Sequence, residues 1–435
     1  MRSRPALGTT AAFAGAVLVA GCMSAGGAVD EERDDVRPVI EVMYPFSGRL
    51  EEGFQQEVGS WAQENEVEVE FAPTDNIDEL VTTRVQGKDA PDVAVLPNPA
   101  LVRRLAEQDV LADLSDVVPE ADQDAVIPDF LEAGRVDDRL FAVPVGLDVS
   151  SVVFYPRAAA EELGLVEPPA TLEDLRVLTD RIAQTGTAPW CFGAESEDPR
   201  YSPAADWLEN LMLIGYGRET YDRWVQHEFR FDDPRVAAVL EQMEALLLAD
   251  GRTSGGREAV ATTDGITAAA PMFADPRGCS LYRQDGSVVR GGAFPEEVVE
   301  DVDESVGVFP LPGRTPEDRP VLARGQLAAV FNQADGAARQ LVQFMASPDF
   351  GTNGHGAGGV WISPRTDFDQ ELYPDETWRA IARIAYESTE FVLDGSDQMP
   401  REVGSRLLPR EMTAWISGEQ DLQTMLADIE AGWPT

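Results

Sequence analysis

Apolar positions along the first part of the chain alternate between short runs and longer stretches with one apolar face. Short runs typical of strands occur at 39–43, 67–71 and 92–96, and turn residues such as proline follow them. The intervals have helical spacing, in which Phe54 and Val58 share one face. This alternation of strands and helices predicts a parallel sheet with short connecting loops.

The strand pattern returns later in the chain. Runs at 141–145 and 152–155 stand in tandem with a break between them, which fits a crossover from one lobe to another. Helical spacing dominates 171–248, strands return at 305–309 and 327–331, and the last stretch is mostly helical. The pattern predicts two α/β lobes joined by several crossing segments. In open α/β sheets, ligands bind beyond the carboxyl ends of the strands.

The N-terminal segment has the features of an export signal. Arg2 and Arg4 precede an apolar run, 11–20, that is too short to span a bilayer and ends at Cys22. The ending resembles the lipobox of bacterial lipoproteins, which implies a signal peptide over 1–21 and lipidation of Cys22; a secretory signal with a chance cysteine is the alternative. The acidic stretch 22–36 is expected to be a flexible tether. We therefore expect an extracytoplasmic protein, lipid-anchored to the outer face of the cytoplasmic membrane.

Charge limits the classes of partner. The chain has 435 residues and a net charge of −44, and Lys88 is its one lysine. This charge argues against nucleic acid and anionic lipid surfaces as partners. It is otherwise typical of a solvated acidic surface. The remaining length exceeds one ordinary core, so two domains are expected.

Cys191 and Cys279 are the cysteines that remain besides Cys22. Export would place them in an oxidising space, where a disulfide is expected. A catalytic thiol would need a base, and the two histidines, His227 and His355, lie far from both cysteines in sequence. Contact in space is not thereby excluded.

Motifs for catalysis and metal binding are missing from the sequence. It contains no HExxH, CxxC, GxSxG or P-loop pattern, so no cofactor and no metal site are expected. Carboxylates are too abundant for a glycosidase pair to be recognised, so that chemistry stays open. What remains are aromatic and polar residues at loop positions. Sugars have apolar faces and many hydroxyls, so such residues suit a sugar site.

Nearly the whole mature chain resembles the extracellular solute-binding proteins of sugar ABC importers, and more narrowly their α-glucoside-binding branch. The general resemblance is carried by VMYPFSG, APDVAVLPNPALV, FAVPVGLDVSSVVFYPRAAAEELG, PATLEDL, VGVFPLP and RGQLAAVF. The branch-specific resemblance is carried by APWCFGAESE, PAADWLENLML, MFADPRGCSLYRQ, GGVWISPRTDF, YPDETWRAIA, DGSDQMPREVG and IEAGWP. The stretch around Ser280 and Tyr282 departs from the branch, which leaves the sugar's identity and length open.

The resemblance implies a two-lobed periplasmic-binding-protein-like fold of type II, with a hinge and a ligand cleft. By analogy, one lobe takes 37–147 and 320–357, and the other takes 148–319 and 358–435. Both lobes would contact an α-linked di- or oligosaccharide, so binding would favour closure. The closed monomer would then deliver the sugar to ABC permease subunits in the membrane. The branch also pairs the cysteines of its PWC and GC segments, which correspond to Cys191 and Cys279.

Within the stretch GGVWISPRTDFD, Trp361 is expected to be a stacking plate in the cleft. Arg365 is expected to donate to hydroxyls or to pair with Asp367 or Asp369. The other candidate ligand contacts are Ser47, Asn98, Asp148, Glu195, Trp207, Phe273 and Arg324. Asp75 is a weaker candidate because it also suits a helix N-terminus. A secreted glycosidase and a binding protein for a polyol or peptide are the alternative functions.

Overall fold

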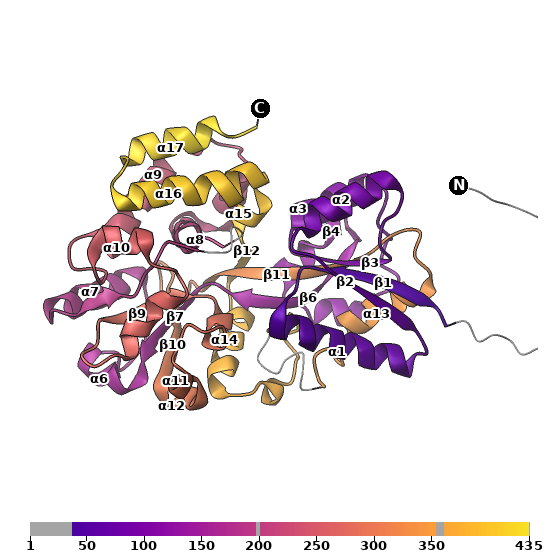
Figure 1. Ribbon diagram of the computed structural model, residues 1–435, viewed down its shortest axis with the longest axis horizontal. Helices are drawn as coiled ribbons and strands as arrows, with labels where there is room; N and C mark the ends of the chain where they lie inside the picture. The colour runs from indigo at the N-terminus through magenta and orange to yellow at the C-terminus, as the bar shows by residue number, and fades with distance from the viewer. Residues whose placement is uncertain (1–36, 197–200, 354–360, 435) are drawn as a thin grey trace, which may run out of the picture. The chain divides into compact units, whose positions relative to one another are not determined.

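Strands β1 (Val39–Tyr44), β2 (Glu68–Pro73) and β3 (Val93–Leu96) form the parallel arrangement that the sequence predicts (Figure 1). The structure is a computed structural model and describes residues 37–196, 201–353 and 361–434. β1 lies between its two neighbours: Val42 is opposite Phe71 of β2 and opposite Val93 of β3. The prediction of a β-α-β-α-β unit is confirmed.

The remaining strands are β4 (Arg135–Val136), β5 (Arg139–Leu140), β6 (Ala142–Val149), β7 (Val152–Pro156), β8 (Ala188–Trp190), β9 (Cys279–Gln284), β10 (Val306–Pro310), β11 (Pro320–Val330) and β12 (Glu390–Leu393). The longer helices are α1 (Gly48–Glu64), α2 (Ile77–Gly87), α3 (Pro99–Glu107), α7 (Leu172–Gln184), α8 (Pro203–Val225), α9 (Pro234–Met243), α13 (Gly336–Ala346), α14 (Glu376–Tyr386), α16 (Leu408–Ser417) and α17 (Leu422–Ala431). Shorter ones are α4 (Glu120–Asp124), α5 (Pro128–Glu132), α6 (Ala160–Leu163), α10 (Gly256–Thr262), α11 (Glu296–Glu300), α12 (Val302–Ser305) and α15 (Gly395–Gln398). The 3-10 and π turns are η1 (Arg157–Ala159), η2 (Glu244–Leu248), η3 (Thr267–Phe273), η4 (Gly286–Val289), η5 (Gln370–Leu372) and η6 (Glu402–Leu407).

Two main sheets organise the part of the chain that the structure describes. The larger has the order β12-β11-β3-β1-β2, with β6 paired antiparallel to β11, and the smaller has the order β10-β7-β9-β8. The chain passes from the larger sheet to the smaller between β6 and β7, and it returns between β10 and β11. The tandem strands therefore mark a crossing between sheets, as the sequence predicts.

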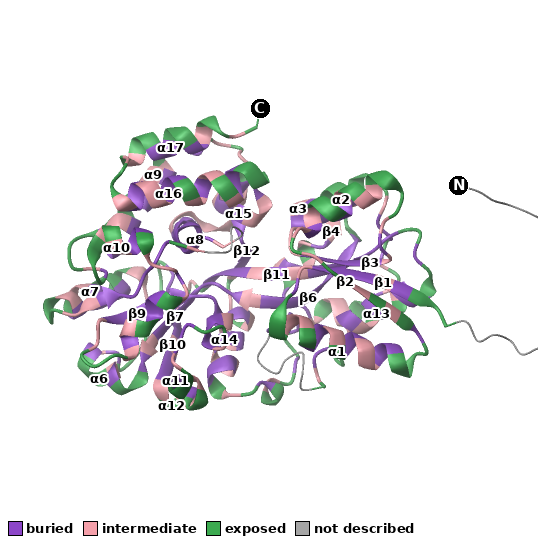
Figure 2. Ribbon diagram, in the orientation of Figure 1, coloured by how far each residue is buried: buried purple, intermediate pink, exposed green. Residues whose placement is uncertain are grey.

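The central strands are buried and the helices are half exposed. β3 is buried along its whole length, as expected for a strand with a covered sheet face on each side. Figure 2 shows the strands mostly in the buried colour, with exposed positions on the outer sides of the helices. On β11, Gly325 allows close packing, because a Cβ atom there would lie 2.3 Å from the ring of Phe130.

Local sequence fixes where several helices begin. Asn98 precedes Pro99, the first residue of α3, and its Oδ1 accepts a hydrogen bond from the backbone N–H of Ala100 at 2.9 Å. Thr171 and Asp174 form a capping box at the start of α7. These caps satisfy backbone N–H groups that have no partner within the helix.

The sequence pattern missed strands in both main sheets. β8, β9 and β12 were not predicted, and β11 begins at Pro320 rather than at 327. β9 contains Arg283 and Gln284, which are buried although polar. Over the described ranges, no helix has both the length and the apolar character needed to cross a membrane.

Candidate functional site

A pocket of about 940 Å³ receives side chains from segments that are far apart in the sequence. One group comes from the ends of β1, β2 and β3 and from α2 and α3, and includes Phe46, Asp78 and Asn98. The other comes from Tyr201, from the end of β9, from β11 and from the α15–η6 segment. The lining side chains of this cleft pocket meet at the carboxyl ends of parallel strands, where α/β proteins bind ligands.

The wall formed by α2 and α3 contains a carboxylate with a free oxygen. Asn98 Nδ2 donates to Asp78 Oδ2 at 3.0 Å, while Asp78 Oδ1 is buried without a hydrogen-bond partner. Burial raises the pKa of the Asp78 carboxyl, and the hydrogen bond from Asn98 partly offsets this rise. This wall therefore contains an acceptor that no group of the described chain satisfies.

The opposite wall is centred on Arg324 of β11. Its guanidinium pairs with Asp285, with Asp206 at 2.9 Å and with Asp394 at 3.2 Å. We call these three aspartates and Arg324 the Arg324 cluster. Asp285 also lines the pocket, and its Oδ1 is buried without a hydrogen-bond partner. Arg324 is therefore engaged by protein carboxylates and orients Asp285 toward the pocket.

The structure places some of the predicted ligand contacts in the pocket and others outside it. Asn98 and Arg324 line it. Asp148 does not line the pocket. Its two carboxylate oxygens accept from the backbone N–H of the lining residue Ser287, at 3.1 and 3.2 Å. Burial and the neighbouring Asp285 raise the pKa of Asp148 to about 7.

Ser47 and Glu195 are exposed, and neither is among the lining residues. Ser47 is the N-cap position of α1 and directly follows the lining residue Phe46. Glu195 pairs through its backbone with the segment at Asp264, and its N–H donates to the Thr263 carbonyl at 3.0 Å. Ser47 is a candidate because it lies at the carboxyl end of a predicted strand, although a residue at a strand end need not line the pocket.

The aromatic candidates need correction. Trp361 is 6% exposed and stacks on Phe350 with ring centroids 5.8 Å apart, so it belongs to the core. It lies over Gly146, where an added Cβ atom would come within 3.0 Å of the indole. Trp207 is buried against Trp190 in an edge-to-face contact of 5.1 Å. Neither is a pocket plate in this conformation.

Phe273 also packs inward, edge to face with Phe294 at 5.4 Å. Arg365 is buried and is held by protein groups. It makes two contacts of 2.9 Å with Asp367, another of 2.9 Å with Asp122, and donates to the Ala346 carbonyl at 2.7 Å. Of the two roles expected for Arg365, the structure supports the pairing with Asp367.

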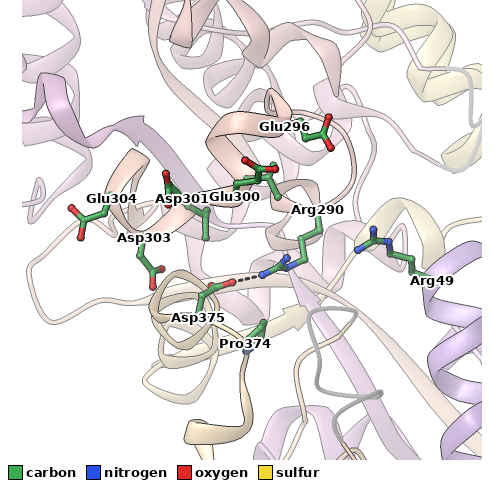
Figure 3. A pocket seen from close by; sticks show the side chains of 11 residues that line it. Arg49, Arg290, Glu296, Glu300, Asp301, Asp303, Glu304, Pro374 and Asp375 are labelled. Carbon is green, nitrogen blue, oxygen red and sulfur yellow. Dashed lines mark hydrogen bonds and ion pairs between the residues drawn. The ribbon is translucent and has the colours of Figure 1, made fainter.

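A second pocket, of about 580 Å³, is lined mainly by charged groups (Figure 3). Arg290 pairs with Asp375 at its centre, Arg49 of α1 faces it, and the other carboxylates come from α11, α12 and the residue between them. It lacks the mixture of apolar surface and convergent polar groups that small-molecule sites show. The cleft pocket is therefore the better candidate site.

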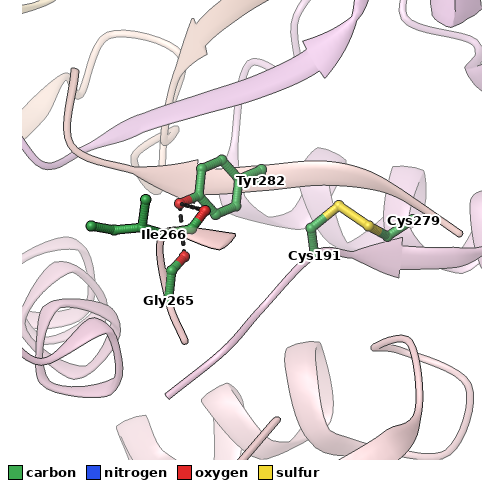
Figure 4. The surroundings of a disulfide bond; sticks show 5 residues. All are labelled: Cys191, Gly265, Ile266, Cys279 and Tyr282. Carbon is green, nitrogen blue, oxygen red and sulfur yellow. Dashed lines mark hydrogen bonds between the residues drawn. A yellow bond between two sulfur atoms is a disulfide. The ribbon is translucent and has the colours of Figure 1, made fainter. Parts of the chain in front are cut away.

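A disulfide joins Cys191 to Cys279, which confirms the predicted pair (Figure 4). Both cysteines are buried, and Cys279 begins β9, which ends at the lining residue Gln284. On the same strand, Tyr282 donates from its hydroxyl to the Gly265 carbonyl at 2.8 Å. The disulfide and this hydrogen bond fix the strand that leads to Asp285.

Asp78, Tyr201, Gln284, Asp285 and Asp397 line the pocket and were missed. Asp78 could have been found, because the rule for strand ends also applies to β2, and the loop after β2 leads directly to Asp75 and Asp78. Asp285 had no comparable signal, since β9 itself was not recognised. Within the residues that the structure describes, no group of three or more His, Cys, Asp or Glu side chains could hold a metal ion.

Comparisons with known proteins agree with this architecture. Residues 47–351 match the family described as bacterial extracellular solute-binding protein. The osmoprotective compounds-binding protein GgtB of Synechocystis is 30% identical, over 96% of this chain and 97% of its own. The alpha-glucosides-binding periplasmic protein AglE of Rhizobium meliloti is 30% identical, over 90% of this chain and 85% of its own.

Solved structures show the same two-lobed fold. The bacterial solute receptor AcbH, described as preferring β-D-galactopyranose, superposes with a TM-score of 0.75. It shares 16% sequence identity over 91% of this chain and 98% of its own. The maltose-bound MalE3 of T. maritima has a TM-score of 0.62, at 20% identity over 90% of this chain and 98% of its own. The chain belongs to the family of bacterial extracellular solute-binding proteins.

Proposed function

We propose that this protein is the substrate-binding component of a sugar ABC importer and captures an α-linked di- or oligosaccharide. The observation that carries the proposal is the cleft pocket, whose volume of about 940 Å³ suits a ligand of that size. Asp78 and Asp285 line it, and each has a buried carboxylate oxygen without a hydrogen-bond partner among the described residues. Sugar hydroxyls supply the hydrogen-bond donors that such oxygens need.

The α-glucoside class is supported by the similarity to AglE, which is named as an alpha-glucosides-binding protein. GgtB is equally identical and is named for osmoprotective compounds, which favours a second candidate: a smaller polyhydroxylated ligand. Aromatic side chains of the described lining are limited to Phe46 and Tyr201. The pocket therefore offers little aromatic surface on which a sugar ring could stack. Hydrogen bonds would contribute more than stacking to the recognition of either class of ligand.

We propose one lobe of 37–147 with 320–357 and another of 148–319 with 358–435. The crossings at β6–β7 and β10–β11 lie close to these limits. Arg401 donates to Asn76 at 3.3 Å across the pocket rim, which illustrates how closure would bring the two sides together.

Binding rather than catalysis is the proposed role, since the relatives are solute-binding proteins. Family membership places the protein outside the cytoplasm. We further propose that 1–21 is a signal peptide, that 22–36 is a tether, and that Cys22 carries the lipid anchor. All three lie outside the described residues. A membrane permease would receive the sugar from the monomeric closed form.

A thermal-shift panel on the chain from residue 23 tests the proposal. It contains trehalose, maltose, sucrose, maltotriose, glucitol and a peptide mixture. A ligand at 100 times its Kd adds about 2.7 kcal/mol of stability. The proposal is supported if an α-glucoside raises the melting temperature and the sugar is unchanged after prolonged incubation with the protein. No shift with any sugar, or release of glucose, contradicts it.

A further inference from the structure

We call the part of the cleft pocket at Arg324 and Asp285 its inner end. Among the described residues, carboxylates outnumber guanidinium groups there. Arg324 pairs with Asp206, Asp285 and Asp394, while Asp148 and Asp397 lie close enough to interact electrostatically with the cluster. Arg283 is the second guanidinium there, and it donates to the carbonyls of Ser150 and Pro203. Five carboxylates thus lie around two guanidinium groups. Burial raises the pKa of Asp148 and Asp206 to about 7 and that of Asp397 above its usual value, so the excess of negative charge develops as the pH rises above 7.

Other ionisable groups behind this end do not correct the imbalance. Glu209 is buried and accepts from the Tyr221 hydroxyl and from two backbone N–H groups at the start of α15. Tyr201 and Tyr282 are neutral phenols whose pKa values burial raises further. The other lining arginines contact α2: Arg401 pairs with Glu79 at 3.5 Å, and Arg104 donates to Thr82 at 3.4 Å.

The free positions at this end are acceptors. Asp285 is 7% exposed, lines the pocket and has an Oδ1 atom without a hydrogen-bond partner. Behind it, Asp206 Oδ2 also lacks a hydrogen bond, although Arg283 lies 3.6 Å away. A hydroxyl donates one hydrogen bond and accepts others, whereas an ammonium group donates three and accepts none. An ammonium group at the pocket wall therefore matches the free acceptor of Asp285 and the excess of carboxylates behind it.

We propose that the inner end of the pocket, at Asp285, is a subsite for a protonated amine of the ligand. The preferred cargo would then be an amino-substituted sugar or polyol. The inference rests on the proposed function and narrows its substrate class. The same arrangement disfavours sugar acids and sugar phosphates at this end, since an anion there would lie among carboxylates. The guanidinium groups described at this end, Arg324 and Arg283, are already engaged by protein groups.

Matched probes that differ by one amine test the subsite by calorimetry at pH 8. They are trehalose against 6-amino-6-deoxytrehalose, and glucitol against 1-amino-1-deoxyglucitol. We expect the amine of at least one pair to bind about tenfold more tightly, which is 1.4 kcal/mol. Asp285→Asn should abolish this preference. Asp394→Asn removes a partner of Arg324 that does not line the pocket, and should preserve the ratio within the pair.

The outcomes separate the two proposals. If neutral sugars bind and no amine binds more tightly, the amine subsite is overturned and the sugar-binding proposal stands. A preference that persists in Asp285→Asn also overturns the subsite. If no probe and no neutral sugar binds, both proposals fail. Thermal melting of each variant checks that it is folded.

Discussion

Nη2 of Arg324 lies 2.9 Å from Oδ1 of Asp206, and this contact joins β11 to α8. Asp206 is almost fully buried, and burial raises its pKa to about 7 even though Arg324 and Arg283 oppose the rise. β11 of the larger sheet is thus tied electrostatically to a helix that packs behind the pocket. This relationship makes Arg324 a positioning residue for Asp285.

Replacing Arg324 should destabilise the protein. Arg324→Gln leaves Asp206, Asp285 and Asp394 without their shared cation, and loss of one partner of a buried ion pair costs about 3–5 kcal/mol. Urea unfolding measures the change. Arg176→Gln, which removes a surface arginine of α7, is the control and should leave stability unaltered. Equal stability of the two variants would contradict the role of the cluster.

Stability should fall as pH rises from about 5 to 7. Burial raises the pKa of Asp148 and of Asp206 to about 7, so the folded chain keeps protons that the unfolded chain releases near pH 4. Each group contributes a slope of up to about 1.4 kcal/mol per pH unit in this window. The pKa of Asp303 is lowered in the folded chain, so this group has the opposite effect on stability. The stability that it contributes is lost only as the pH falls below the usual pKa of an aspartate.

The measurement is urea unfolding between pH 4 and 8 in 0.5 M NaCl, which screens repulsion between surface charges. Asp148→Asn should show a shallower decline than the unmodified chain. A stability that rises with pH over this window, or an identical slope in the variant, would disprove this account of the buried carboxylates.

The disulfide should stabilise the fold. Cys191 and Cys279 are 88 residues apart, and removing a cross-link of this kind usually costs about 2–4 kcal/mol. Cys191→Ala with Cys279→Ala should melt at a lower temperature than the oxidised chain and should not respond to a reducing agent. Identical melting of oxidised, reduced and substituted proteins would argue against a structural disulfide.

Trp361 should matter for stability rather than for affinity. It stacks on Phe350 in the core, so Trp361→Phe should lower stability by about 1–3 kcal/mol and change the affinity for sugar less than twofold. Calorimetry and urea unfolding on the same sample separate the two effects. A tenfold loss of affinity at unchanged stability would restore the stacking role that the sequence suggested.

The apolar runs predicted the parallel strands because β1 and β3 are almost entirely apolar and buried between neighbours. β9 escaped prediction because its sequence, CSLYRQ, mixes apolar and polar residues that tertiary contacts bury together. Arg283 is a case in point: its charge suggests a surface position, yet its guanidinium donates to two buried carbonyl groups. The local sequence pattern does not indicate which residues far away in the sequence will become partners in the fold.

The orientation of candidate site residues was hard to predict for a related reason. Asn98 was found because it directly follows a predicted strand, and Arg324 because the resemblance extends over β11. Trp207 and Trp361 were selected because turns flank them, but a tryptophan beside a turn can still point inward, as both do here. Orientation depends on what space the fold leaves, such as the room above Gly146 that the indole of Trp361 fills.

Calorimetric titration with trehalose and maltose tests the central claim most directly, using the unmodified chain, Asp78→Asn, Asp285→Asn and the surface control Arg176→Gln. Asp78 and Asp285 supply the unpartnered oxygens on opposite walls of the pocket. The account predicts binding of at least one sugar by the unmodified chain and the control, with at least tenfold weaker binding by both pocket variants. Absence of binding by the unmodified chain, or equal affinity in all four proteins, would contradict it.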